Sequence, residues 1–167
     1  MTTTENHTAT SAPTTFRGTV ATPELEKNLQ KVLVDLVALH IEGKQFHWNV
    51  LGANFRDLHL QLDEIVHAAR EHSDTIAERM RALYAVPDGS VRTVAATTTL
   101  PQQPTGELST TEAVNAMTDL LHRAAGTARA VHDAVDAEDP STADLLHAVI
   151  VDLEKQAWML SAENRRA

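Results

Sequence analysis

Apolar side chains recur every three to four residues along most of the chain, a spacing that predicts amphipathic α-helices rather than β-strands. The first such pattern follows Thr22, a suitable N-cap with Pro23 at the first helical position, and continues to about Val50. The second pattern runs from about Asn54 to Tyr84, after a short connection that contains a glycine. The first half of the chain therefore predicts two long helices joined by a tight turn.

A long connection separates these helices from the second half of the chain. Residues 86–108 contain three prolines, two glycines and a run of threonines, which favour a loop over a continuous helix. Within this connection, residues 91–97 are suited to a short extra helix. A crossover of this length is typical of a bundle in which two antiparallel helix pairs are joined.

Two further long helices are predicted after the crossover. Ser109 and Glu112 have the spacing of a capping box, which marks the start of the third long helix. The fourth begins at Asp139 and continues to about Asn164. The whole pattern predicts an all-α four-helix bundle over residues 22–167, with a short extra helix in the crossover between the second and third helices.

The beginning of the chain differs in composition from the rest. Residues 1–21 are mostly threonine, serine, alanine and proline, and they predict a disordered N-terminal tail. They lack the basic start and the apolar stretch of a secretory signal. Since no apolar run in the chain approaches the length that crosses a bilayer, we expect a soluble cytoplasmic protein with no membrane partner.

The composition limits the chemistry that this bundle can carry. The chain has no cysteine, which excludes disulfides, thiolate metal sites, iron–sulfur clusters and a cysteine nucleophile. Any metal site must use histidine, aspartate or glutamate, and the chain has nine histidines. The formal net charge of −9 argues against a uniformly basic nucleic-acid surface and favours an acidic surface that attracts cations.

A stripe of possible metal ligands runs along the second predicted helix. It consists of His59, Asp63, Asp74 and Glu78, which fall within about 100° of arc and well away from the apolar stripe. A solvated polar face with a chance histidine explains the same pattern equally well. His59 and Glu78 are also about 28 Å apart along the helix axis, so one helix cannot bring all four side chains to one ion.

A second copy of the same helix removes this difficulty. His59 pairs with Glu78, and Asp63 pairs with Asp74, about one shared midpoint between residues 68 and 69. A two-fold axis at that point would place the first member of each pair opposite the second member in the partner chain. The sequence thus permits two identical metal sites in one dimer interface.

His47 is a further candidate ligand. It lies near the end of the first predicted helix, so a chain that turns back there can place it beside His59. Two imidazoles and two or three carboxylates, without sulfur, suit a divalent metal such as Fe(II), Mn(II) or Zn(II). A shell rich in carboxylates also stabilises Fe(III) after oxidation.

The same residues carry a resemblance to a known family. In type and spacing they resemble the signature of the Dps family, ferritin-like mini-ferritins named for DNA protection during starvation. The match covers about residues 22–165 and includes the following residues: His47-Trp48-Asn49-Val50, Gly52, Asn54-Phe55, His59, Asp63, Asp74 and Glu78. The resemblance implies a ferritin-like bundle that assembles with copies of itself as a hollow dodecameric shell.

The resemblance also implies iron sites between two-fold related subunits, with two ferroxidase sites in each dimer interface. Each site would take ligands from both subunits: His47, His59 and Asp63 from one, and Asp74 and Glu78 from the other. Glu78 would be the main bridging carboxylate. Trp48 corresponds to a tryptophan beside the site that is proposed to intercept radicals.

Acidic three-fold pores for ion entry are a further implication of the resemblance. Asp144 matches a family pore position, and Glu138 and Asp139 lie nearby at the start of the fourth predicted helix. Pro140 and Ser141 stand where other members often have further acids, so this pore would carry less negative charge. An acidic residue in the first turn of a helix also interacts favourably with the helix dipole, and the two roles of Asp144 are compatible.

The function implied by the resemblance is that of an iron-oxidising and iron-storing enzyme. Such a ferroxidase oxidises Fe(II), preferably with hydrogen peroxide, and stores Fe(III) as a mineral in the shell, which protects DNA from oxidative damage. A nucleoid-associated DNA-binding protein with secondary iron chemistry is the alternative, and a structural helical oligomer without an active metal is a third. Direct DNA binding has weak support, because the predicted tail has only one basic residue, Arg17.

Overall fold

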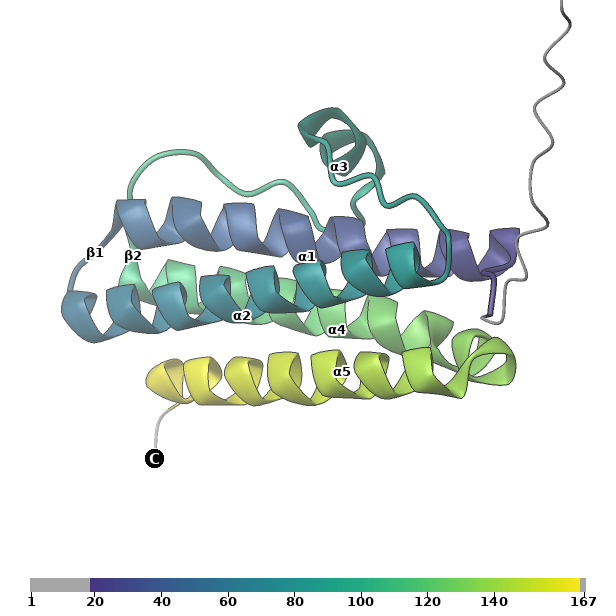
Figure 1. The fold of residues 1–167 in the computed structure, drawn as a ribbon. Helices are drawn as coiled ribbons and strands as arrows, with labels where there is room; N and C mark the ends of the chain where they lie inside the picture. The colour runs from purple at the N-terminus through teal and green to yellow at the C-terminus, as the bar shows by residue number, and fades with distance from the viewer. Residues whose placement is uncertain (1–18, 166–167) are drawn as a thin grey trace, which may run out of the picture.

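The computed structural model describes residues 19–165, and this part of the chain is a bundle of four long helices (Figure 1). The predicted all-α bundle with a short helix in the crossover is confirmed. Positions 1–18 of the predicted tail lie outside the described residues. The elements in chain order are α1 (Pro23–Asn49), β1 (Val50–Leu51), α2 (Phe55–Ala82), α3 (Val91–Thr97), β2 (Leu108–Ser109), α4 (Thr110–Glu138), α5 (Pro140–Ser161) and the 3₁₀ turn η1 (Ala162–Asn164).

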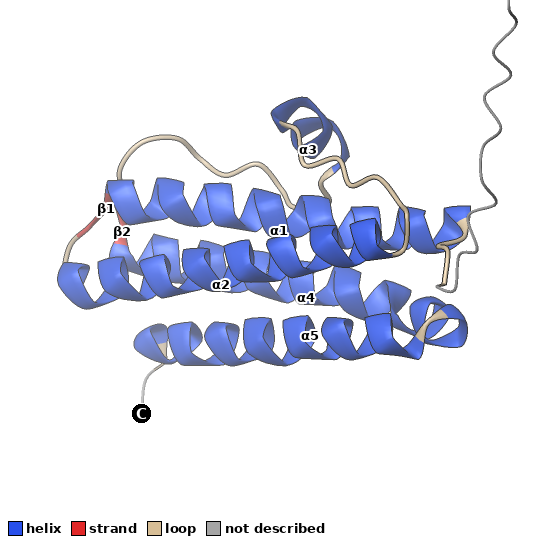
Figure 2. Cartoon of the chain, in the orientation of Figure 1, coloured by secondary structure: helices blue, strands red, loops and turns tan. Residues whose placement is uncertain are grey.

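Two short strands at one end of the bundle are absent from the predicted pattern. β1 pairs in parallel with β2, with Val50 opposite Leu108 and Leu51 opposite Ser109 (Figure 2). Strands of two residues are too short to show an alternation of apolar and polar side chains, so periodicity does not reveal them. Their pairing ties the end of α1 to the start of α4, and it thereby fixes the turn that leads into α2.

Aliphatic side chains fill the space between the long helices. α1 packs along α2, and α4 packs along α5, while α3 lies outside the bundle against α1 (Figure 1). All four long helices contribute fully buried side chains, among them Leu39 and Phe46, Leu62 and Ile76, Met117 and Leu121, and Leu153 and Leu160. Within residues 19–165, no helix has the length and apolar character needed to cross a membrane.

A buried carboxylate, Asp35, holds the crossover against the bundle. Its Oδ1 accepts hydrogen bonds from the Thr98 hydroxyl and the Thr99 backbone N–H, both at 2.7 Å. Its Oδ2 accepts from the hydroxyls of Thr99 and Thr127, at 2.6 and 2.7 Å. Because Asp35 is only 1% exposed, these four bonds replace the water that its charge gives up on burial. They join α1, the segment after α3, and α4.

A second buried cluster joins the end of α2 to the turn between α4 and α5. Arg79 donates to Asp139 at 2.5 Å and to the Thr142 hydroxyl at 2.8 Å, and that hydroxyl donates to Asp139 at 2.5 Å. Burial disfavours the charged form of Asp139, but the hydrogen bonds from Thr142 and Arg79 and the Arg79 charge outweigh it, so the pKa of Asp139 is lowered. The cluster is therefore an ion pair at neutral pH.

The lowered pKa of Asp139 makes the stability of the fold depend on pH in a defined direction. The cluster stabilises the fold fully above the ordinary aspartate pKa, and this contribution is lost as the pH falls through the folded-state pKa. We expect Asp139→Asn to lower the free energy of unfolding by about 3 kcal/mol at neutral pH. The variant should also lose less of its remaining stability on acidification than the unsubstituted protein.

Urea unfolding at neutral and acidic pH measures both effects. Asp136→Asn is the matched control, since Asp136 is an exposed aspartate near the end of α4, three residues before Asp139, and it should leave both quantities unchanged. Equal stability of Asp139→Asn and the unsubstituted protein at neutral pH would contradict the role of the cluster.

Candidate metal centre

The histidines His47 and His59 hold each other in place at the junction of α1 and α2. The Nδ1 atom of each ring donates a hydrogen bond to the backbone carbonyl oxygen of the other residue, both at 2.9 Å. The rings stack with centroids 3.7 Å apart and planes 22° from parallel. Because a carbonyl oxygen only accepts, each Nδ1 carries the hydrogen, and each neutral ring keeps its lone pair on Nε2. Both rings are therefore held in the tautomer that binds metals through Nε2.

The turn between α1 and α2 brings these histidines together. Gly52 has a φ of 120°, and Asn54 has a φ of 58°, both in the region that most side chains avoid. A Cβ atom on Gly52 would make only ordinary contacts, the nearest 3.5 Å from Thr110, so the backbone conformation rather than space favours glycine there. The sharp reversal places the last turn of α1 beside the second turn of α2, as the sequence predicts.

Asp63 lies one turn after His59, beside His47. Its Oδ1 is 3.8 Å from the His47 Nδ1, and it accepts a hydrogen bond from the Lys44 ammonium group. The Lys44 hydrogen bond is the largest cause of the lowered pKa of Asp63; desolvation opposes it, and the charges of His47, Lys44 and His59 add to it. Asp63 is therefore ionised at neutral pH and already paired with a cation.

Lys44 is the residue at this centre that sequence reasoning missed. It lies three residues before His47, so the two side chains share a face of α1, and this spacing is the signal that was available. Its side chain is 30% exposed and that of Asp63 is 50% exposed, so water reaches the pair. A metal that binds through the same Asp63 oxygen must displace the ammonium group.

Asp74 and Glu78 lie towards the other end of α2, and the single chain does not bring them to His47 and His59. Both side chains are exposed. Within residues 19–165, no group of three or more histidines, aspartates and glutamates is arranged to hold a metal ion. The five ligands implied by the resemblance are thus split between two places on one subunit, and their union across an interface stays a prediction.

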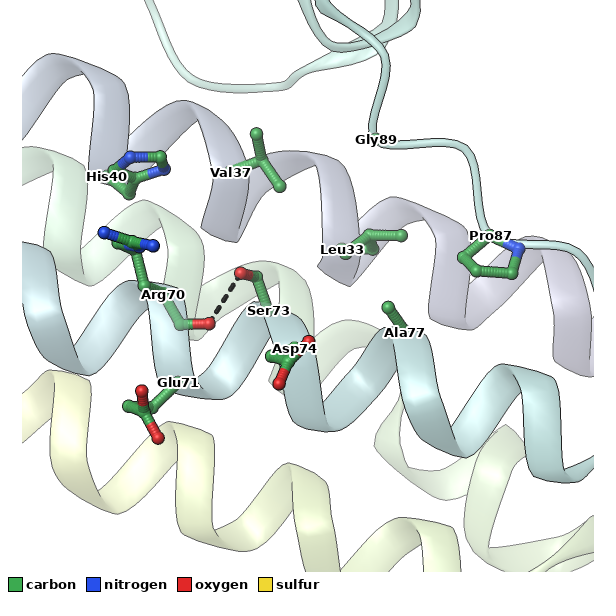
Figure 3. Close-up of a pocket in the computed structure, with 10 residues that line it drawn as sticks. All are labelled: Leu33, Val37, His40, Arg70, Glu71, Ser73, Asp74, Ala77, Pro87 and Gly89. Carbon is green, nitrogen blue, oxygen red and sulfur yellow. Dashed lines mark hydrogen bonds between the residues drawn. The ribbon is translucent and has the colours of Figure 1, made fainter.

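Two hollows lie along the exposed face of α2. The first has a volume of 560 Å³ and extends to Lys44, and the second has a volume of 480 Å³ and extends to Pro87 and Gly89 (Figure 3). Figure 3 shows His40 of α1 facing Arg70 of α2 in the second hollow. The α2 residues that line the first hollow are Leu60, Asp63, Glu64, Val66, His67 and Arg70, and those of the second are Arg70, Glu71, Ser73, Asp74 and Ala77. Each hollow therefore contains one of the predicted ligands.

Aromatic side chains lie at the edge of the histidine pair. The Phe55 ring is 5.2 Å from the His59 ring, and Trp48, which follows His47, is 63% exposed. The exposed indole of Trp48 is accessible to dissolved species. The role of Trp48 in intercepting radicals stays a prediction.

The three acids predicted for an entry pore occupy different environments. Asp144 is highly exposed in the first turns of α5, and its Oδ1 is 3.7 Å from the His147 Nδ1. Glu138 accepts hydrogen bonds from the backbone N–H and the hydroxyl of Thr22, at 2.9 and 2.6 Å. Asp139 is the buried partner of Arg79 described above. The structure gives Glu138 and Asp139 local partners, and the pore itself stays a prediction.

Comparisons with known proteins agree with one another. A sequence model of the Ferritin-like domain matches residues 26–166. A DNA protection during starvation protein of Agrobacterium fabrum is 35% identical over 135 residues, which are 80% of this chain and 83% of that protein. A protein of the same name from Brevibacillus brevis is 33% identical over 135 residues, which are 80% of this chain and 90% of that protein.

Solved structures show the same similarity in three dimensions. The crystal structure of Dps92 from Deinococcus radiodurans superposes with a TM-score of 0.81 at 31% identity, covering 83% of this chain and 84% of that one. Dps from Microbacterium arborescens in the high iron form also has a TM-score of 0.81 and 31% identity, covering 87% of this chain and 98% of that one.

The Lys44–Asp63 pair gives a prediction about metal affinity. Lys44→Gln removes the cation that competes with a metal for Asp63, so the affinity for Co²⁺ should rise by about threefold, as expected for a partly exposed ion pair. Isothermal titration calorimetry with Co²⁺ measures the change. Lys31→Gln, an exposed lysine on the same helix, is the control and should leave the affinity unaltered. An unchanged or weaker affinity of Lys44→Gln would show that the ammonium group does not compete.

Proposed function

The chain belongs to the Dps family of ferritin-like proteins, and we propose that it is a ferroxidase and iron store. It oxidises Fe(II), preferably with hydrogen peroxide, and keeps Fe(III) as a mineral inside a dodecameric shell of its own copies. The observation that carries this proposal is the stacked His47–His59 pair, whose reciprocal hydrogen bonds occupy each Nδ1 and leave the Nε2 lone pair of each ring free of them. Such a pair is prepared for a metal before the metal arrives.

The donor set fits iron as a substrate. Two imidazoles and three carboxylates, without thiolate, suit Fe(II), and the negative charges stabilise the extra positive charge of Fe(III) more strongly. His47 and His59 hold the ion through Nε2, while the carboxylates supply the charge. Two Fe(II) ions give two electrons to one molecule of hydrogen peroxide, which takes up two protons and leaves as water. This route consumes peroxide without releasing hydroxyl radicals, which protects DNA.

The two hollows on α2 support a centre shared between two subunits. A two-fold axis between residues 68 and 69 relates the α2 lining of the first hollow to that of the second. The related pairs are Leu60 with Ala77, Asp63 with Asp74, Glu64 with Ser73, Val66 with Glu71, and His67 with Arg70. The axis inferred from the ligands therefore also sets one hollowed surface against the other. In this arrangement Asp74 and Glu78 of one subunit complete the centre that His47, His59 and Asp63 of the other begin.

DNA contact is the weaker candidate. The relatives' name refers to DNA protection, and removal of iron and peroxide protects DNA without contact. All four lysines of the chain lie within α1 and α5, and the formal net charge is −9. A long-range electrostatic attraction to phosphates therefore has little support in this subunit.

A mixing experiment tests whether the centre is shared. His59→Gln and Glu78→Gln should each slow Fe(II) oxidation by hydrogen peroxide by about tenfold or more, because each removes one ligand from every centre. When the two variants are co-expressed in equal amounts, half of the dimers pair one variant with the other. Each mixed dimer has one centre with all its ligands, so about one quarter of the centres should be intact and activity should partly return.

Stopped-flow absorbance of Fe(III) formation measures these rates, and light scattering confirms that the assembly persists. Glu24→Gln, an exposed glutamate in the first turn of α1, is the control and should oxidise Fe(II) at the unsubstituted rate. If co-expression restores no activity beyond the mean of the two variants, the centre is not shared between subunits.

A further inference from the structure

A second pair of histidines lies between α4 and α5, away from the centre formed by α1 and α2. The rings of His132 on α4 and His147 on α5 have centroids 4.3 Å apart and planes 33° from parallel. The two residues come from adjacent antiparallel helices, so the packing of the bundle rather than a local sequence motif brings them together (Figure 1). They share no residue with the candidate metal centre.

One atom of this pair lacks a partner. The His132 Nδ1 is 3.1 Å from the Asp133 carboxylate, which can only accept, so Nδ1 carries the hydrogen and the neutral ring has its lone pair on Nε2. That Nε2 is buried and has no hydrogen-bond partner among the described residues. A buried polar atom without a partner is costly, and an ion or a water molecule is the usual remedy.

Carboxylate and solvent complete the surroundings of the pair. Asp144 lies one turn before His147 on α5, with its Oδ1 3.7 Å from the His147 Nδ1. The His147 and Asp144 side chains are 60% and 84% exposed, so both can change rotamer without disturbing the core. His132 is the fixed member of the group, because its side chain is only 19% exposed.

We propose that His132 and His147 bind a divalent transition-metal ion, with Asp144 and water as the remaining ligands. Imidazole nitrogens and one carboxylate form a set that Zn²⁺ and Co²⁺ bind well, and an ion bound here gives the His132 Nε2 the partner that it lacks. The three side chains do not surround one point in the structure, so coordination requires the exposed His147 and Asp144 side chains to rotate towards the His132 Nε2. All three side chains belong to one subunit, so the site does not rest on the proposed function.

Zn²⁺ titration of the metal-free, fully assembled protein tests this site. Isothermal titration calorimetry should show that the double variant His132→Gln/His147→Gln binds about one equivalent less per subunit than the unsubstituted protein. His147→Gln alone should weaken that equivalent by about tenfold or more, and because His147 is exposed this variant keeps the fold. His122→Gln, an exposed histidine on α4, is the matched control and should bind as the unsubstituted protein does.

Chemical modification gives an independent measurement. Diethyl pyrocarbonate should modify His147 and His122 in the metal-free protein, and one equivalent of Zn²⁺ per subunit should protect His147 but not His122 when the products are mapped by mass spectrometry. Equal Zn²⁺ stoichiometry and affinity in all variants would overturn the proposal, as would equal protection of both histidines. The two rings would then be a packing contact without a metal.

Discussion

The reciprocal hydrogen bonds between His47 and His59 tie the end of α1 to the beginning of α2, and they also decide the chemistry of both rings. A surface histidine exchanges its hydrogen between two nitrogens and turns freely about its side-chain bonds. Here each Nδ1 is committed to a carbonyl oxygen at 2.9 Å, so the tautomer and the orientation are set together. The two side chains lose their conformational freedom during folding, so a metal that binds later has a smaller entropic cost of ordering its ligands. The backbone turn at Gly52 and Asn54 makes this exchange of bonds possible.

The geometry of the two histidines favours metal binding, whereas the Lys44 ammonium group on Asp63 opposes it. The overall negative charge draws cations towards the protein, yet Asp63 already holds the Lys44 ammonium group. While no metal is present, the lysine keeps the carboxylate ionised and offsets the free-energy cost of removing that carboxylate from water. The lysine also sets a minimum binding free energy for any competing ion, because a monovalent cation interacts too weakly with Asp63 to displace the ammonium group. A divalent ion that gains two imidazole ligands as well can meet that threshold.

The sequence predicts the helices well because each long helix buries a stripe of apolar side chains and exposes a stripe of polar ones. It predicts the closeness of His47 and His59 for a related reason, since both flank a turn of a few residues. Features that depend on elements far apart in the chain are not predictable in this way. Asp35 looks like an ordinary polar interruption of α1 until the threonines of the crossover and of α4 meet it. The β1–β2 pairing has the same cause, because it joins segments more than fifty residues apart. Asp74 and Glu78 are separate from the histidines in one chain, and a partner copy that would bring them together stays a prediction.

The two histidine pairs of this bundle show how the second hydrogen bond of an imidazole determines what the ring can do. In the pair at α1 and α2, backbone carbonyls take both Nδ1 hydrogens, and these acceptors cannot move without unwinding a helix. In the pair at α4 and α5, the fully exposed Asp133 carboxylate takes the His132 hydrogen, and the Asp144 carboxylate is 3.7 Å from the His147 Nδ1. Both rings of the first pair are therefore held by the backbone, whereas the second pair has one mostly buried ring and one exposed ring. Rigid ligands favour a reaction in which the metal must keep its geometry while its charge changes, because less of the surroundings must reorganise. A pair with one exposed ring suits an ion that binds reversibly, since the exposed ring can turn away from the ion without disturbing the core.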